Sequence, residues 1–178
     1  MHADRTGAEQ QQLGSVEERD GRRVLRYERP LAHPPERVWR ALTDPSELRG
    51  WLAAADEFDR REGGRVVLRW LNTDDEGNTA IATGTVSVFE PPPVLELDTD
   101  IHGRIRWELE DAPDGCVLTL TVVAELPDDF VTEVAAGWHV HIDFLEDALA
   151  GSPISDWDNW PRDRWERLHE AYVERDGG

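Results

Sequence analysis

The sequence predicts an α+β domain in which one long helix packs on an antiparallel sheet. Hydrophobic and polar residues alternate, with the period of a strand, through most of residues 65–124. Turn signals at Glu90–Pro93 and Ala112–Gly115 divide that stretch into hairpins. A run with helical period follows, from Asp128 to Gly151. Because the strands are grouped before the helix rather than alternating with helices, we expect an antiparallel sheet.

The elements ahead of the main sheet are a leader, a strand and two short helices. Residues 1–21 are rich in Gln, Glu and Gly and poor in apolar side chains, so we expect a disordered leader. Residues 23–29 alternate apolar and charged side chains, as a half-buried strand does. Pro34-Pro35 is expected to open one short helix, because proline is favoured in a first helical turn. Asp44-Pro45 is expected to start a second helix that contains residues 48–52.

Five strands and the long helix complete the predicted domain, which we place at residues 22–151. The strands are expected at residues 65–70, 80–89, 95–99, 101–109 and 116–124. In the helix, apolar side chains recur every three or four residues and form one stripe that faces the sheet. This stripe consists of Val131, Val134, Trp138, Ile142, Leu145 and Leu149.

The segment after the helix, residues 152–178, is a Trp-rich extension that contains Trp157, Trp160 and Trp165. Val140 and Phe144 fall off the apolar stripe of the long helix, on the side that a bare sheet-and-helix domain leaves in water. We expect residues 153–174 to fold back on the helix and cover that side. The alternative is that Phe144 and these tryptophans form a homodimer contact, so the chain is expected to be a monomer or a homodimer.

The charge of the chain excludes several classes of partner. Its 178 residues include 38 Asp and Glu against 19 basic residues, a net charge of −19. Such a field repels nucleic acid and anionic membranes, which bind clustered cations. The chain also has no apolar run of membrane-spanning length, no signal-peptide pattern in residues 1–20, and a single cysteine, Cys116. We therefore expect a cytoplasmic protein that binds neither nucleic acid nor membrane.

Several motifs together resemble one known family. The longest is Pro34-Pro-Glu-Arg-Val-Trp-Arg-Ala-Leu-Thr-Asp-Pro45, followed by Leu48 and Trp51. The others are Gly63-Gly64, Gly84 before Glu90-Pro-Pro-Pro93, Trp107 before Gly115, and Gly137-Trp138. The stretch 23–151 resembles homologues of the activator of heat-shock-protein-90 ATPase, in the START-like or polyketide-cyclase-like helix-grip superfamily. This resemblance implies a curved antiparallel sheet around the long helix. The superfamily includes carriers of hydrophobic ligands, cyclases and aromatases, and chaperone-associated domains.

A curved sheet that grips a helix commonly leaves a cavity between the two, and aromatic walls suit an apolar ligand. Strand parity and helical phase direct one set of side chains into this space. The residues predicted to contact a ligand are Trp70, Trp107, Trp138, His141, Ile142 and Leu145. The tryptophans are either plain core or pocket lining, and His141 is either a satisfied core histidine or a ligand contact.

The sequence indicates no metal or cofactor. His139 and His141 are two apart on a helix and point in different directions, so they cannot share one ion, whereas His139 and Asp143 can pair on the surface across a turn. The loop from Asn72 to Thr83 has the acids of a calcium loop but lacks the bidentate Glu at its twelfth position.

The expected function is non-catalytic binding of a small hydrophobic molecule between the sheet and the long helix. A chaperone-associated protein-interaction module is the first alternative. A cyclase or aromatase is the second, and it requires a general acid or base in the pocket. Only His141, Tyr27 and arginines could supply one, so the sequence favours a binding protein over an enzyme.

Overall fold

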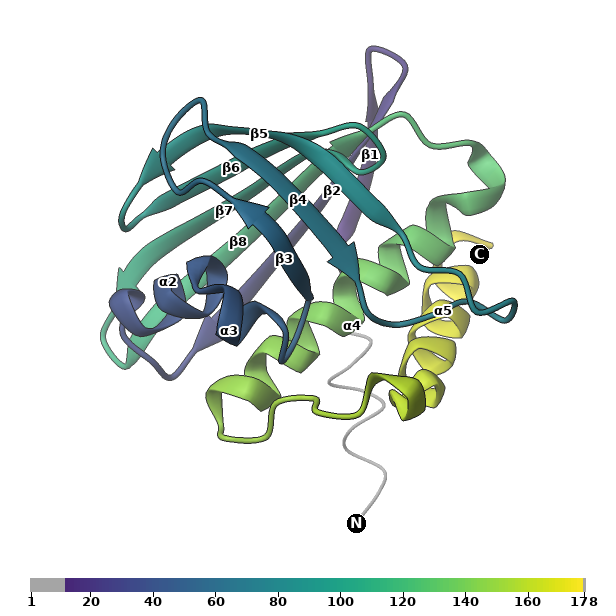
Figure 1. Ribbon diagram of the computed structural model, residues 1–178. Helices are drawn as coiled ribbons and strands as arrows, with labels where there is room; N and C mark the ends of the chain where they lie inside the picture. The colour runs from purple at the N-terminus through teal and green to yellow at the C-terminus, as the bar shows by residue number, and fades with distance from the viewer. Residues whose placement is uncertain (1–11, 178) are drawn as a thin grey trace.

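The computed structural model describes residues 12–177 and shows an eight-stranded antiparallel sheet that curves around one long helix (Figure 1). The strand order is β1-β2-β8-β7-β6-β5-β4-β3. The strands are β1 Ser15–Arg19, β2 Arg22–Leu31, β3 Ala53–Phe58, β4 Arg65–Trp70, β5 Ile81–Glu90, β6 Val94–Thr99, β7 Gly103–Ala112 and β8 Gly115–Ala124. The long helix, α4, spans Val131–Leu149. The predicted α+β class and helix-grip arrangement are confirmed.

Two short helices connect β2 to β3 and close one end of the sheet. Helix α2 spans Pro35–Thr43 and buries its apolar side, and α3 spans Pro45–Leu48. The Asp44 side chain caps α3 by accepting from the backbone N–H of Ser46 at 2.9 Å. Trp51, predicted inside the second helix, follows it instead, and its indole N–H donates to the Ala41 carbonyl at 2.9 Å. The polar edge of this fully buried side chain is therefore satisfied.

The leader prediction is wrong for residues 12–21, because strand β1 lies within them and pairs antiparallel with β2. Asp20 and Gly21 both have positive φ, 52° and 78°, which is the geometry of a tight hairpin turn. The Asp-Gly pair was the available signal, but β1 has one apolar residue, Val16, and no alternation to accompany it. Residues 1–11 of the predicted leader lie outside the described residues.

The C-terminal segment forms a third layer on the outer side of α4. After the turn at Gly151, a 3-10 turn at Trp157–Asn159 leads into helix α5, Arg162–Asp176, which lies beside α4 (Figure 1). Val140 is 1 % exposed and Phe144 is fully buried, and the Trp157 ring lies 6.1 Å from the Phe144 ring. Helix α4 is thus covered by the sheet on one side and by the C-terminal segment on the other.

Candidate functional site

The structure brings three of the predicted ligand residues together as an interior aromatic cluster. The Trp138 ring lies 6.0 Å from Trp70 and 6.4 Å from Trp107, with edge-to-face geometry. Trp51 extends the cluster, 5.5 Å from Trp107. These four rings are buried. The cluster of mutually packed tryptophans therefore lies in the core of the sheet-and-helix domain, and it does not include the tryptophans of the C-terminal segment. Edge-to-face packing of this kind is a stable core arrangement.

The other three predicted ligand residues lie on α4 and are also buried. Ile142 and Leu145 are at most 1 % exposed. His141 donates from Nδ1 to the Trp51 carbonyl at 2.8 Å, and burial lowers its pKa to about 4. Its ring also contacts Phe144 and Trp157. These side chains pack the interior, and their role as ligand contacts stays a prediction.

An open cleft of about 570 Å³ lies beside the aromatic cluster, and Trp70 belongs to both. The cleft lies between the end of β4, the β4–β5 loop, α4 and the C-terminal segment. Its apolar lining comprises Trp70, Ala80, Gly137, Val140, Trp160 and Trp165. Its polar lining comprises Asn72, Thr73, Asp74, Asp75, Asn78, Thr79, Glu133 and Arg162. Sequence reasoning missed this cleft, because its walls meet only when the C-terminal segment folds back.

The β4–β5 loop is held in shape by its own hydrogen bonds. The Asp74 carboxylate accepts from the backbone N–H groups of Asn78 at 2.8 Å and Glu76 at 2.9 Å. These bonds, the one from Asn78 first, lower the pKa of Asp74. Arg162, the first residue of α5, forms an ion pair with Asp75 at the tip of the loop. The loop and the C-terminal segment are thereby joined across the cleft.

Two buried side-chain polar atoms lack a hydrogen-bond partner among residues 12–177. One is Asn72 Oδ1, on a residue that lines the cleft. The other is His102 Nε2, whose ring lies 4.3 Å from Trp70 and 5.7 Å from Trp138. Burial lowers the pKa of His102 to about 4, so the imidazole is neutral at neutral pH. Unpartnered buried polar atoms are rare in folded proteins; here one lies against Trp70 and the other belongs to a residue that lines the same cleft as Trp70.

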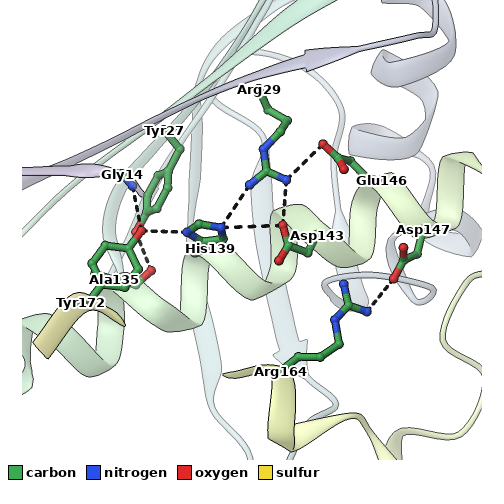
Figure 2. A network of polar contacts seen from close by, with 10 residues as sticks. All are labelled: Gly14, Tyr27, Arg29, Ala135, His139, Asp143, Glu146, Asp147, Arg164 and Tyr172. Carbon is green, nitrogen blue, oxygen red and sulfur yellow. Dashed lines mark hydrogen bonds and ion pairs between the residues drawn. The ribbon is translucent and has the colours of Figure 1, made fainter. Parts of the chain in front are cut away.

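A separate polar network links β2, α4 and α5 (Figure 2). Arg29, on β2, is 4 % exposed and points toward α4. Its guanidinium donates to Asp143 at 2.7 Å, to Glu146 at 3.1 Å and to His139 Nε2 at 3.3 Å. His139 and Asp143 do lie together as predicted, with Nε2 3.8 Å from Oδ1, but their location on the surface is wrong, because His139 is buried and Arg29 lies against both residues. A buried arginine with two carboxylates satisfies the rule that buried charges are paired.

The proton on His139 can be assigned from its neighbours. Arginine only donates, so Nε2 of His139 accepts and Nδ1 carries the hydrogen, which it donates to the Tyr172 hydroxyl at 2.9 Å. The Tyr172 oxygen also accepts from the Gly14 N–H at 2.8 Å. Burial lowers the pKa of His139 to about 4 and raises that of Tyr172 to about 12. Both groups are therefore neutral at neutral pH, and the network joins α5 and Gly14 to the core.

The remaining candidates from the sequence have structural roles. Burial raises the pKa of the Cys116 thiol, which makes it a poor nucleophile. The acidic loop after Asn72 uses Asp74 to bind its own backbone. Within the described part of the chain, no three metal-ligating side chains lie together, and no helix is long and apolar enough to cross a membrane.

Comparison with known proteins supports the resemblance seen in the sequence. Residues 32–150 match the family described as "Activator of Hsp90 ATPase homolog 1-like protein". No curated protein matches this chain. Among solved structures, a protein from Bordetella parapertussis is 29 % identical with a TM-score of 0.64, and the match covers 85 % of each chain.

Two further structures share the fold over nearly the whole chain. CalU16 from Micromonospora echinospora has a TM-score of 0.68 at 22 % identity, covering 93 % of this chain and 96 % of that one. A conserved protein of unknown function from Enterococcus faecalis has a TM-score of 0.67 at 16 % identity, covering 96 % of both. At these identities the likeness shows the fold alone. The family match covers most of the chain and agrees with the fold, so the protein belongs to the family of activator of Hsp90 ATPase homolog 1-like proteins, within the START-like helix-grip superfamily.

Proposed function

We propose that the protein binds a small hydrophobic molecule, without catalysis, in the cleft between the end of the sheet, α4 and the C-terminal segment. The observation that carries this proposal is the meeting of three indole side chains in one cleft. Trp70 comes from β4, Trp160 from the turn before α5, and Trp165 from α5. Ligand pockets typically have a few hundred cubic ångströms and aromatic walls, and this cleft has about 570 Å³.

The aromatic cluster behind Trp70 forms the inner wall of the proposed site. Trp138 packs against the Trp70 ring from within the core, and Trp107 in turn packs against Trp138. A bound molecule therefore meets a rigid aromatic surface rather than a side chain that must first be ordered, which reduces the entropic cost of binding. His141, Ile142 and Leu145 are buried on α4 and do not line the cleft.

The composition of the lining favours binding over catalysis. Its ionisable side chains are the carboxylates of Asp74, Asp75 and Glu133 and the guanidinium of Arg162. The hydrogen bonds that lower the pKa of Asp74 keep it ionised, and arginine stays protonated. A general acid or base works best with a pKa near the operating pH, and a carboxyl with a lowered pKa does not meet that condition.

A protein-interaction module is the second candidate, and its support is the name of the family. A stable interface usually has an apolar centre. Within residues 12–177, the large apolar side chains that are about half exposed lie on four different segments: Ile81, Ile101, Phe130 and Val173. The surface therefore favours the small-molecule site.

The proposal is tested by filling the cleft from within. A Cβ at Gly137 would meet only the Trp165 indole nitrogen, at 4.0 Å, so a larger side chain can enter the cleft. Gly137→Leu should keep or raise stability, because glycine is about 1 kcal/mol worse than alanine inside a helix. It should also abolish binding of the neutral fluorescent probe N-phenyl-1-naphthylamine, whereas Gly137→Ala should retain at least part of it.

Native mass spectrometry of freshly purified protein provides a second measurement. A co-purifying small molecule that Gly137→Leu loses and Gly137→Ala keeps would identify the ligand. Equal probe binding by Gly137→Leu and wild type would show that the cleft is not the site. Stimulation of a purified Hsp90 ATPase by a protein that binds no probe would favour the interaction module.

A further inference from the structure

The lining of the cleft is rich in hydrogen-bond acceptors. The carboxylates of Asp74, Asp75 and Glu133 face a single guanidinium, Arg162. Arg162 is engaged with Asp75 and lies 3.4 Å from Glu166. Within residues 12–177, neither Asp74 nor Glu133 forms an ion pair with an arginine. The cleft thus carries more negative than positive charge, and its one cation is already paired.

Asn72 adds an acceptor that is buried in the wall of the cleft. Its Oδ1 has no hydrogen-bond partner in the described part of the chain. Leaving a buried acceptor unpaired costs about 1–3 kcal/mol, so a ligand that donates to it would recover this energy. Carboxylates likewise only accept. A ligand that complements the three carboxylates and the Asn72 oxygen must carry hydrogen-bond donors.

The aromatic walls favour the same kind of ligand. Trp70, Trp160 and Trp165 line the cleft, and the face of an indole ring attracts a cation more strongly than that of Tyr or Phe. The Trp165 indole N–H is directed at the Glu133 backbone carbonyl, at 3.4 Å, so its hydrogen-bonding edge is engaged with α4. Indole rings beside a carboxylate form a setting in which a cation is attracted both by the rings and by the charge.

We infer that the ligand of this cleft is a hydrophobic amine, protonated at neutral pH, whose ammonium group lies near Glu133 and Asn72 and whose apolar body lies against the tryptophans. The inference rests on the proposed function and names the ligand class for that site. An ammonium supplies donors to the carboxylates and to the Asn72 oxygen, and the net charge of −19 favours the approach of cations. An anionic ligand would have to displace Asp75 from Arg162 and leave that carboxylate unpaired.

The test compares three probes that share one aromatic body and differ in charge. These are 1-naphthylmethylamine, which is cationic at pH 7, 1-naphthalenemethanol, which is neutral, and 1-naphthoate, which is anionic. Isothermal titration calorimetry with the full chain should give about tenfold tighter binding for the amine than for the alcohol, and weakest binding for the carboxylate.

Matched variants locate the preference within the cleft. Glu133→Gln should reduce the preference for the amine about two- to fivefold and leave binding of the alcohol unchanged, as expected for one exposed carboxylate. Glu174→Gln removes the same charge from an exposed residue of α5 that does not line the cleft, and it should preserve the preference.

The outcomes separate this inference from the proposal on which it rests. Equal binding of amine and alcohol, or tighter binding of the carboxylate, would overturn the amine class and leave the cleft as a binding site. If Glu133→Gln and Glu174→Gln reduce the preference for the amine equally, the preference comes from the overall charge of the protein. That result would overturn the placement of the ammonium group near Glu133. Failure of all three probes to bind would contradict the proposed function itself.

Discussion

Acid should unfold this protein early, because three buried histidines are held neutral in the folded state. His102, His139 and His141 each have a pKa lowered by burial from 6.5 to about 4. In the unfolded chain the same groups regain their ordinary pKa. The unfolded state therefore binds more protons than the folded state between pH 6.5 and pH 4. Their contribution to stability is fully present above pH 6.5 and is lost as the pH falls toward 4.

The size of the effect follows from these values. At pH 5 each such histidine lowers the free energy of unfolding by about 2 kcal/mol relative to pH 8, or about 6 kcal/mol for the three. This is comparable with the whole stability of an ordinary domain, about 5–15 kcal/mol. Between pH 5 and 6 the free energy of unfolding should fall by about 3–4 kcal/mol per pH unit, which corresponds to uptake of nearly three protons.

Urea denaturation at closely spaced pH values, followed by tryptophan fluorescence, measures this slope. His141→Asn keeps a side-chain N–H that can donate to the Trp51 carbonyl but cannot titrate. The pH dependence of its free energy of unfolding should therefore correspond to uptake of about one proton fewer than in the wild type. A free energy of unfolding that stays flat from pH 6.5 to pH 5 would refute the reasoning. So would an unchanged slope in His141→Asn.

Three other predictions concern the C-terminal segment and the charge. Tyr172→Phe leaves the buried N–H groups of His139 and Gly14 without an acceptor, so chemical denaturation should show a loss of about 2–4 kcal/mol, and a wild-type value would contradict the network. Truncation after Gly151 exposes Val140 and Phe144, each worth about 1.5–3 kcal/mol, so we expect a lower melting temperature and aggregation on size-exclusion chromatography. Loss of a dimer with an intact domain would instead indicate a homodimer contact. Moderate salt should raise the melting temperature by screening the net charge of −19, and no change would show that local arginine pairs already compensate the acids.

The parts of the fold that the sequence predicted have strong periodic signals. The stripe on α4 and the alternation in β4 to β8 follow from burial of one face, which leaves a regular pattern. The edge strands lack such a pattern. Strand β1 has one apolar residue, and β3 begins with the run Ala53–Ala55, whose small side chains show no alternation. Their pairing is decided by the neighbouring strand, so the local sequence does not reveal it.

The polar interior was predictable only in part. Arg29 has the same strand parity as Leu25 and Tyr27, which places it inside, yet a charged residue is normally assigned to the surface. Its burial depends on Asp143 and Glu146, more than a hundred residues away in sequence. The cleft depends in the same way on tertiary structure, because Trp160 and Trp165 reach Trp70 only through the path of the C-terminal segment. Strand parity and helical phase predict the side of an element on which a side chain lies. They do not predict which distant segments of the chain will lie next to it.

The contact between Gly14 and Tyr172 has a consequence for how the chain folds. It joins residues 158 positions apart, and the Arg175 guanidinium donates to the Gly14 carbonyl over an even longer separation. Contacts between distant residues form slowly, because a long loop must be closed first. During synthesis on the ribosome, the sheet and α4 are complete before α5 has emerged, and the side of α4 that carries Phe144 is then uncovered. The nascent domain passes through a stage with an apolar helix face in water, and α5 ends that stage by covering this face and bonding to Gly14, next to β1.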